Sequence, residues 1–251
     1  DVDGGADAAV AIMTTDTVPK TAVLVREGVT VGGMAKGAGM LAPALATMLV
    51  VLTTDAVVDA RTADRVLRRA TSVTFDRIDS DGCMSTNDTV LLLASGASGI
   101  EPDEAVLADL VGAVCADLAR QLIGDAEGAS KDIEIVVEHA ATEAEAVDVA
   151  RAVSRSNLLK CAIHGEDPNW GRILSAVGTT SAAFEPSQVD VWINGIRVCR
   201  GGGVGDDRAL VDLSGRDVRI TVDLAAGDAQ AAIWTNDLTA DYVHENSAYS
   251  T

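Results

Sequence analysis

The stretch from residue 101 to residue 138 most constrains the fold, because a helix pattern passes directly into a strand pattern there. An acidic, proline-containing start at 101–104 is typical of the first turn of a helix. Apolar residues then recur at every fourth position: Val106, Leu110, Val114, Leu118 and Leu122. Ile133, Ile135 and Val137 next alternate with acidic residues, as in a half-buried strand. A long helix feeding such a strand predicts the α/β class.

The other segments extend this alternation in both directions. Helices are predicted at 60–70, 142–154 and 173–177. Strands are predicted at 9–15, 90–94, 158–163, 189–193 and 218–224, with a hairpin joining 21–25 to 29–31. The apolar run at 40–54 fits a buried strand or a buried helix equally well. We expect two regions, 1–129 and 130–251.

Charge and composition exclude several classes of protein. Lys and Arg number 19 against 38 Asp and Glu, which gives a net charge of −19. Binding to a nucleic-acid backbone needs clustered basic residues, so we expect no nucleic-acid partner. The chain is 48% hydrophobic, which excludes a disordered acidic tail. No apolar run approaches the roughly 20 residues of a membrane span, so we expect no membrane partner.

Cysteine and histidine give no sign of a metal site. Cys83, Cys115, Cys161 and Cys199 are widely spaced and form no CxxC pair. The three histidines are scattered and make no ligand cluster. We therefore expect no bound metal or cofactor, and reduced, buried thiols in a cytoplasmic protein.

A glycine-rich stretch holds the first candidate nucleophile. Residues 32–39 contain four glycines, a small-residue stretch follows, and Thr47 then opens an apolar run. A threonine hydroxyl becomes nucleophilic when a base lies beside it, and its own α-amino group can serve once the preceding bond is cut. Such an amine titrates near pH 7.7–8.0 in model compounds. A buried threonine in a strand is the alternative interpretation.

Several strings span the chain in a fixed order: Met13-Thr14-Thr15-Asp16-Thr17 with Pro19-Lys20, Ser85-Thr86-Asn87-Asp88-Thr89-Val90, Asp125-Ala126-Glu127-Gly128-Ala129, Asp167-Pro168-Asn169-Trp170-Gly171-Arg172, Trp234-Thr235-Asn236-Asp237-Leu238-Thr239, and the ending from Asp241 to Tyr249. In this order the strings resemble one family, the ornithine acetyltransferases or bifunctional glutamate N-acetyltransferases of arginine biosynthesis. The stretch 32–49 is similar to the family's self-cleavage region.

The resemblance implies a fold and a reaction. The fold would be an αββα sandwich of the DmpA and ornithine acetyltransferase type, with a further C-terminal α/β region. Ala46–Thr47 would be the bond that cleaves itself, and Thr47 the nucleophile. Thr47 would take the acetyl group of N2-acetylornithine and pass it to glutamate in a ping-pong mechanism. Acetyl-coenzyme A is a further acetyl donor in some members.

The resemblance also assigns substrate-binding residues: Thr14, Lys36, Thr47, Glu127, Asn246 and Thr251. A cationic Lys36 suits a substrate α-carboxylate. Glu127 suits an ammonium group, or assists proton transfer. Asn246 and Thr251 would hold the side-chain end of ornithine or glutamate.

One part of the family pattern has no counterpart in these 251 residues. Family members carry a segment before the strand that resembles 13–17, and it holds a Thr-Gly pair that forms the oxyanion hole. Oxyanion donors are commonly worth about 2.7–4 kcal/mol each. We therefore expect the 251-residue chain alone to be a poor catalyst, and its partner to be the N-terminal chain, in a heterotetramer of two cleaved pairs. The rival hypotheses are a non-catalytic amino-acid-binding fragment, and an amidase or aminopeptidase that uses the same nucleophile.

Overall fold

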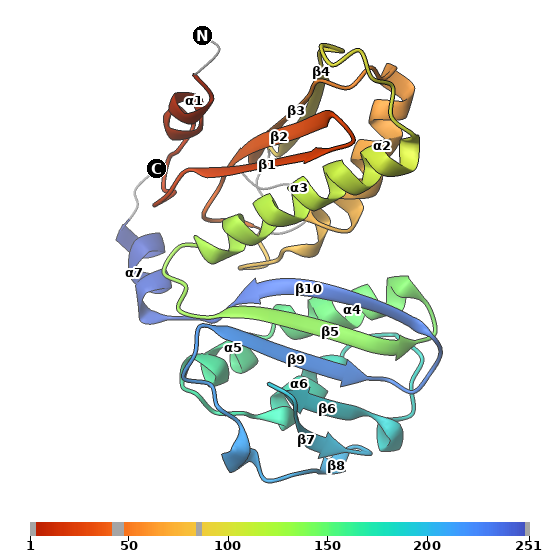
Figure 1. The fold of residues 1–251 in the computed structure, drawn as a ribbon. Helices are drawn as coiled ribbons and strands as arrows, with labels where there is room; N and C mark the ends of the chain where they lie inside the picture. The colour runs from red at the N-terminus through yellow and green to blue at the C-terminus, as the bar shows by residue number, and fades with distance from the viewer. Residues whose placement is uncertain (1–3, 42–47, 84–86, 249–251) are drawn as a thin grey trace. The chain divides into compact units, whose positions relative to one another are not determined.

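The fold is known from a computed structural model that describes residues 4–41, 48–83 and 87–248. The chain divides into two compact units. Unit 1 comprises 1–78 and 82–127, and unit 2 comprises 79–81 and 128–251. Helices and strands alternate in both, which confirms the α/β class (Figure 1). Among the described residues, no helix has both the length and the apolar character needed to cross a membrane.

Unit 1 is built on a sheet that, in the described residues, has four strands in the order β1-β2-β3-β4. β1 (Lys20–Arg26) and β2 (Val29–Lys36) form an antiparallel hairpin, β3 (Leu49–Thr54) pairs antiparallel with β2, and β4 (Thr89–Ala94) pairs parallel with β3. Glu27 and Gly28 both have positive φ, as a two-residue hairpin turn requires. This hairpin confirms the sequence prediction. In the ambiguous run at 40–54, residues 49–54 form the strand β3, and 42–47 lie outside the described residues.

Helices cover one face of this sheet. α3 (Glu104–Gly124) lies along β1 and β2, and α2 (Ala60–Ser72) packs on α3 (Figure 1). Of the five apolar residues predicted from the period of four, Leu110, Val114, Leu118 and Leu122 are buried, and Val106 in the first turn of α3 is only partly buried. Asp59 caps α2 by accepting the N–H groups of Arg61 and Thr62. A short 3₁₀ turn, η1 (Phe75–Arg77), follows α2.

The opposite face of the sheet carries exposed apolar side chains. Val23 pairs across the strands with Gly32, then Thr53, then Leu93, so these residues share one face. Val23 is 66% exposed and Leu93 is 55% exposed. β4 confirms the strand predicted at 90–94, but the burial that such a compact apolar run suggests is wrong, since β4 buries neither Leu91 nor Leu93. An apolar strand is a core strand only when something covers both of its faces.

Unit 2 has a sheet with the strand order β10-β5-β9-β6-β7-β8 among the described residues. Its strands are β5 (Asp132–Ala140), β6 (Asp190–Ile193), β7 (Ile196–Arg200), β8 (Gly203–Val204), β9 (Asp217–Asp223) and β10 (Ala229–Asn236). β5 and β9 are parallel and the other pairs are antiparallel. The predicted alternation holds, because Ile133, Ile135 and Val137 are buried.

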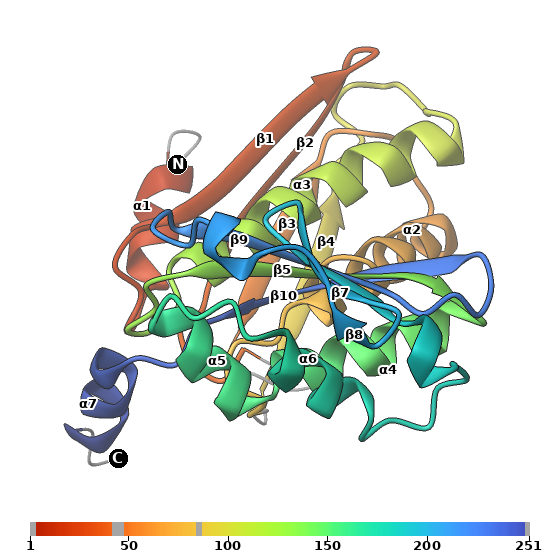
Figure 2. The same ribbon diagram turned by 90° about the horizontal axis from the view of Figure 1, so that it is seen from below.

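Three helices of unit 2 pack on one face of this sheet: α4 (Glu143–Ser154), α5 (Asn157–His164) and α6 (Trp170–Val177) (Figure 2). Thr142 caps α4 by accepting the N–H of Glu145, as the Thr-x-x-Glu pattern predicts. The short 3₁₀ turns η2 (Pro186–Gln188) and η3 (Arg208–Leu210) lie in the connections. α7 (Ala240–Ala248) follows β10.

Two predicted strands are wrong. Residues 9–15 were predicted as a strand, yet 9–11 belong to α1 (Gly5–Ala11), whose alanines favour a helix, and 12–15 form neither a helix nor a strand. Residues 158–163 were predicted as a strand and belong to α5, whose start is fixed by Ser156, which accepts the N–H of Leu159. The prediction of buried thiols was right only in part, since Cys83 and Cys161 are exposed.

Candidate active site

The structure places three of the predicted substrate-binding residues in unit 1. Thr14 lies in the connection between α1 and β1, Lys36 ends β2, and Glu127 follows α3. Lys36 is only 4% exposed although it carries a charge. Ala46, Thr47 and Thr251 lie outside the described residues, so the predicted nucleophile is approached here through its described neighbours.

A buried ion network lies close in sequence to all three residues. The Lys20 ammonium is 2.7 Å from Asp16 Oδ1 and 2.6 Å from Asp125 Oδ2, and the side chains of Lys20 and Asp16 are both 0% exposed. Two carboxylates and one ammonium leave a net charge of −1 in the interior. Buried charges are costly unless they are paired and hydrogen-bonded, so such a network needs further donors.

Main-chain N–H groups are those further donors. Asp16 accepts the N–H of Gly37 at 2.7 Å and the N–H of Thr14 at 3.2 Å. Asp125 accepts the N–H of Thr17 at 3.0 Å and also its hydroxyl. Burial by itself would raise the pKa of Asp16, but the bonds from Gly37 and Lys20 outweigh burial and lower that pKa. Asp16 is therefore a fixed anion at neutral pH.

The network joins the segments that carry the predicted site. Asp16 binds the N–H of Thr14 itself and of Gly37, the residue after Lys36. Asp125 lies two residues before Glu127. Sequence reasoning named Asp16, Lys20 and Asp125 only as members of family strings. Their pairing could not be predicted, because 105 residues separate Lys20 from Asp125.

Glu127 is held against the glycine-rich loop after β2. Its N–H donates to the carbonyl of Ala38 at 2.8 Å. Its carboxylate lies so near Gly39 that a Cβ atom built there would be 2.6 Å from Oε2. A glycine at position 39 is thus needed for this placement of the carboxylate. Lys36 is the first residue of the segment 36–39, and Glu127 is bonded to Ala38 within it. Both ionisable residues predicted to bind substrate are therefore fixed at this segment.

The residue after the predicted nucleophile is also fixed by an acid that sequence reasoning missed. The N–H of Met48 donates to Asp88 Oδ1 at 2.7 Å, and the carbonyl of Met48 accepts the N–H of Thr89. Asp88 belongs to the string 85–90 that resembles the family, but nothing in the string predicts that its partner is the N–H of Met48. The start of β3 is thereby anchored directly after position 47.

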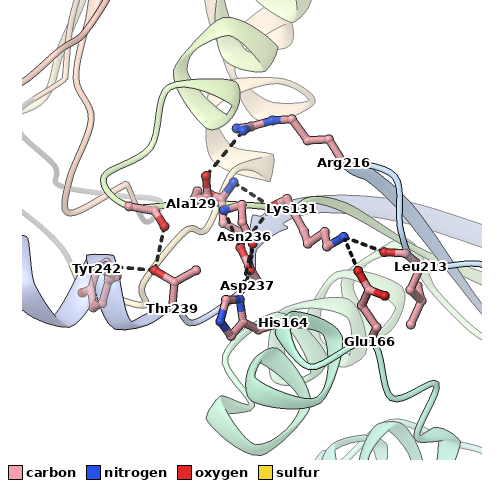
Figure 3. Close-up of polar contacts among 12 residues, drawn as sticks. Ala129, Lys131, His164, Glu166, Leu213, Arg216, Asn236, Asp237, Thr239 and Tyr242 are labelled. Atoms are coloured by element: carbon pink, nitrogen blue, oxygen red, sulfur yellow. Dashed lines mark hydrogen bonds and ion pairs between the residues drawn. The ribbon is translucent and has the colours of Figure 1, made fainter.

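Asn246 lies in unit 2, on the exposed helix α7. A hub around Asp237 holds the chain that leads into this helix (Figure 3). Asp237 accepts the N–H groups of Ser130 and Lys131, both at 2.9 Å, and the Ser130 hydroxyl. The Thr239 hydroxyl donates to the Gly128 carbonyl at 2.6 Å. The start of α7 is thus tied to Gly128, the residue after Glu127.

The same hub contains a serine, a histidine and an aspartate, but they are not arranged for nucleophilic catalysis. His164 Nδ1 is 2.9 Å from Asp237 Oδ2, and the Ser130 hydroxyl donates to the same oxygen (Figure 3). A catalytic serine needs the far ring nitrogen of the histidine as its base. Here both side chains bind the carboxylate, so the cluster fixes the chain. Among the described residues, no group of three His, Cys, Asp or Glu side chains is placed to hold a metal ion.

Comparison with known proteins gives a consistent result. The sequence model of the ArgJ family matches residues 2–251. The arginine biosynthesis bifunctional protein ArgJ of Streptomyces coelicolor is 70% identical over 247 residues, which cover 98% of this chain and 64% of that protein. The protein of the same name from Thermobifida fusca is 65% identical over 249 residues, or 99% of this chain and 65% of that protein. The chain therefore spans about 64% of the length of its Streptomyces coelicolor relative.

A solved structure supports the fold. The crystal structure of the arginine biosynthesis bifunctional protein argJ from Bacillus halodurans aligns with a TM-score of 0.75 at 36% identity. The alignment covers 79% of this chain and 98% of that chain. This likeness agrees with the α/β sandwich type predicted from the sequence.

Proposed function

The chain belongs to the ArgJ family, and on that premise we propose that the protein transfers the acetyl group of N2-acetylornithine to glutamate in arginine biosynthesis. The observation that carries the proposal is the network of Asp16, Lys20 and Asp125, which ties together the segments bearing Thr14, Lys36 and Glu127. Lys36 ends β2, and Glu127 is bonded to Ala38 directly beyond that end. A cation and an anion anchored at the same segment suit an amino-acid substrate that carries both charges.

The reaction begins with self-cleavage. The Thr47 hydroxyl attacks the carbonyl carbon of Ala46, the peptide C–N bond breaks, and an ester forms between the two residues. Water then hydrolyses the ester and leaves Thr47 with a free α-amino group. This amine serves as the base for its own hydroxyl, because its pKa lies near 7.7–8.0 in model compounds.

Acetyl transfer repeats the same chemistry with substrate. Thr47 Oγ attacks the acetyl carbonyl of N2-acetylornithine, the amide C–N bond breaks, and ornithine leaves with the proton. The α-amine of glutamate then attacks the acetyl ester, which yields N-acetylglutamate and restores the hydroxyl. Lys36 pairs with the α-carboxylate, Glu127 pairs with the δ-ammonium of ornithine, and Thr14, Asn246 and Thr251 complete the contacts.

Other features of the proposal follow from the family resemblance. Acetyl-coenzyme A serves as an alternative acetyl donor, with no resident cofactor. The active form consists of two cleaved pairs, in the cytoplasm.

The test uses the full-length protein and intact-mass spectrometry. Wild type should appear as two chains divided between Ala46 and Thr47, and N2-acetylornithine should add one acetyl group to the chain that begins with Thr47. Thr47→Ser keeps a hydroxyl and should still cleave, whereas Thr47→Ala should stay uncut and inactive. Acetyl transfer by uncut Thr47→Ala would refute the proposal. Free acetate in place of N-acetylglutamate would point to a hydrolase.

A further inference from the structure

Resting on the acetyl transfer proposed above, we infer that Asp16, Lys20 and Asp125 form a positioning network whose two arms serve different groups of the substrate. The Asp16 arm fixes the main chain at Thr14 and beside Lys36, and so sets the site for the α-carboxylate. The Asp125 arm fixes the chain that leads to Glu127, and so sets the site for the ammonium group. All three residues act through their neighbours.

Lys20 connects the arms and has no donor to spare. An ammonium group has three N–H donors, and these meet Asp16 Oδ1 at 2.7 Å, Asp125 Oδ2 at 2.6 Å and the Val18 carbonyl at 3.4 Å. The side chain is also 0% exposed. Lys20 therefore does not bind substrate, and its role is to hold both carboxylates in place.

The Asp16 arm acts on the end of β2. Its Oδ1 accepts from Gly37 and Lys20, and its Oδ2 accepts from the N–H of Thr14. Gly37 has a φ of 149°, a conformation that L side chains rarely adopt. The bond to Asp16 therefore fixes the direction in which the chain leaves β2 directly after Lys36. Loss of the Asp16 carboxylate therefore removes the anchors of Thr14 and of Gly37, the residue after Lys36, together.

The Asp125 arm acts on the end of α3. Asp125 directly follows α3, and it is fixed by Lys20 and by the N–H and hydroxyl of Thr17. Two residues later, Glu127 is fixed by its own N–H bond to Ala38. The main chain between these two anchors has little freedom. Loss of the first anchor therefore displaces Glu127 more than it displaces Lys36.

Two acetyl donors separate the arms experimentally. N2-acetylornithine and N2-acetylnorvaline share the α-carboxylate and the acetyl group, but only the first has a δ-ammonium. The single-turnover rate of Thr47 acetylation, followed by mass spectrometry with excess full-length enzyme, can be measured for both donors even when one reacts slowly. The ratio of the two rates reports how well Glu127 recognises the ammonium group.

Asp125→Asn should slow acetylation by N2-acetylornithine about tenfold or more and acetylation by N2-acetylnorvaline less than about threefold, since small displacements of a positioning group have large effects. Asp16→Asn should slow acetylation by both donors by the same factor.

Asp59→Asn is the matched control. It removes a carboxylate of unit 1 that accepts the N–H groups of Arg61 and Thr62 but has no link to the network. Both rates should stay within about twofold of wild type there.

The outcomes distinguish this inference from the proposed function. Failure of wild type to acquire an acetyl group refutes the proposed function. If wild type is acetylated normally but Asp125→Asn slows the reactions of both donors equally, the inference is overturned. The network would then contribute to stability alone. If Asp125→Asn does not fold, Thr17→Val removes only one bond to Asp125. A rate ratio that is unchanged in this milder variant would overturn the inference equally.

Discussion

A methyl group added at Gly39 tests the placement of Glu127 directly. The Cβ of Gly39→Ala would lie 2.6 Å from Oε2, 2.8 Å from Cδ and 2.9 Å from Oε1 of Glu127. Carbon atoms in contact are ordinarily about 3.5–4.0 Å apart, so the carboxylate carbon must retreat by about 0.7–1.2 Å. A misplacement of about 1 Å can cost about 100-fold in rate. We expect the single-turnover rate with N2-acetylornithine to fall by about 10- to 100-fold.

The fold should tolerate the same change. The atoms that must move belong to the end of a flexible side chain, and Gly39 is not among the glycines with positive φ. Replacement of glycine by alanine at a compatible position stabilises a protein by about 0.4–1 kcal/mol. Gly112→Ala is the matched control in α3, where an added Cβ meets nothing within 4 Å. A wild-type rate in Gly39→Ala, with its melting temperature unchanged, would show that Glu127 does not act where the structure places it.

Three further predictions concern unit 2. Gly128→Ala places a Cβ atom 2.2 Å from Tyr242 N at a φ of 62°, so the start of α7 should detach from Gly128. The amides of α7 should then exchange with deuterium faster than in the control Gly215→Ala, where an added Cβ meets nothing within 4 Å. Equal exchange rates in the two variants would contradict this prediction. Burial raises the pKa of Asp237, but hydrogen bonds from Ser130 and Lys131 outweigh burial and lower that pKa. The contribution of the ionised Asp237 to folding stability is therefore complete above about pH 4, and it is lost as the pH falls through the pKa of the folded state. The urea midpoint should therefore fall more steeply below pH 4 in wild type than in Asp237→Asn, and parallel curves would count against the hub. Burial lowers the pKa of Lys160 to about 8, so the unfolded chain binds more protons between pH 8 and 10.5. The stability of wild type should then rise relative to Lys160→Met by about 3 kcal/mol across that range, and a constant difference refutes this.

Long periodic segments were predictable from the sequence, and short ones were not. α3 has 21 residues, and its apolar positions fit only the period of a helix. β5 has nine residues, and its alternation of apolar and acidic residues fits only the two-residue period of a strand. Residues 158–163 are too few to separate a strand from a helix. Ser156, which caps α5, was the signal that could have decided it. The exposure of β4 was not predictable, because an apolar strand does not reveal which elements cover its faces.

The predicted site divides in a similar way. The resemblance to a family supplied Lys36 and Glu127, since each belongs to a recognisable string. The glycine at position 39 was counted as part of a glycine-rich stretch, and its contact is with Glu127, 88 positions further along the chain. Asp88 and Asp237 were present in their strings, but their partners are main-chain N–H groups, which every residue except proline carries. No residue pattern marks such a partner.

The ion network shows what charged side chains do in the interior of unit 1. A buried lysine and its carboxylate partners can often be replaced by apolar side chains without loss of stability, so stability alone gives a weak reason for them. An apolar side chain cannot, however, accept the N–H groups of Thr14, Thr17 and Gly37. The bond from Gly37 is buried, and an unsatisfied buried N–H costs about 1–3 kcal/mol. The carboxylates are needed as acceptors for the main chain, and Lys20 offsets one of their two negative charges. Because these bonds act on the backbone of 14, 17 and 37, they fix whole segments at once, including those that carry Thr14 and Lys36.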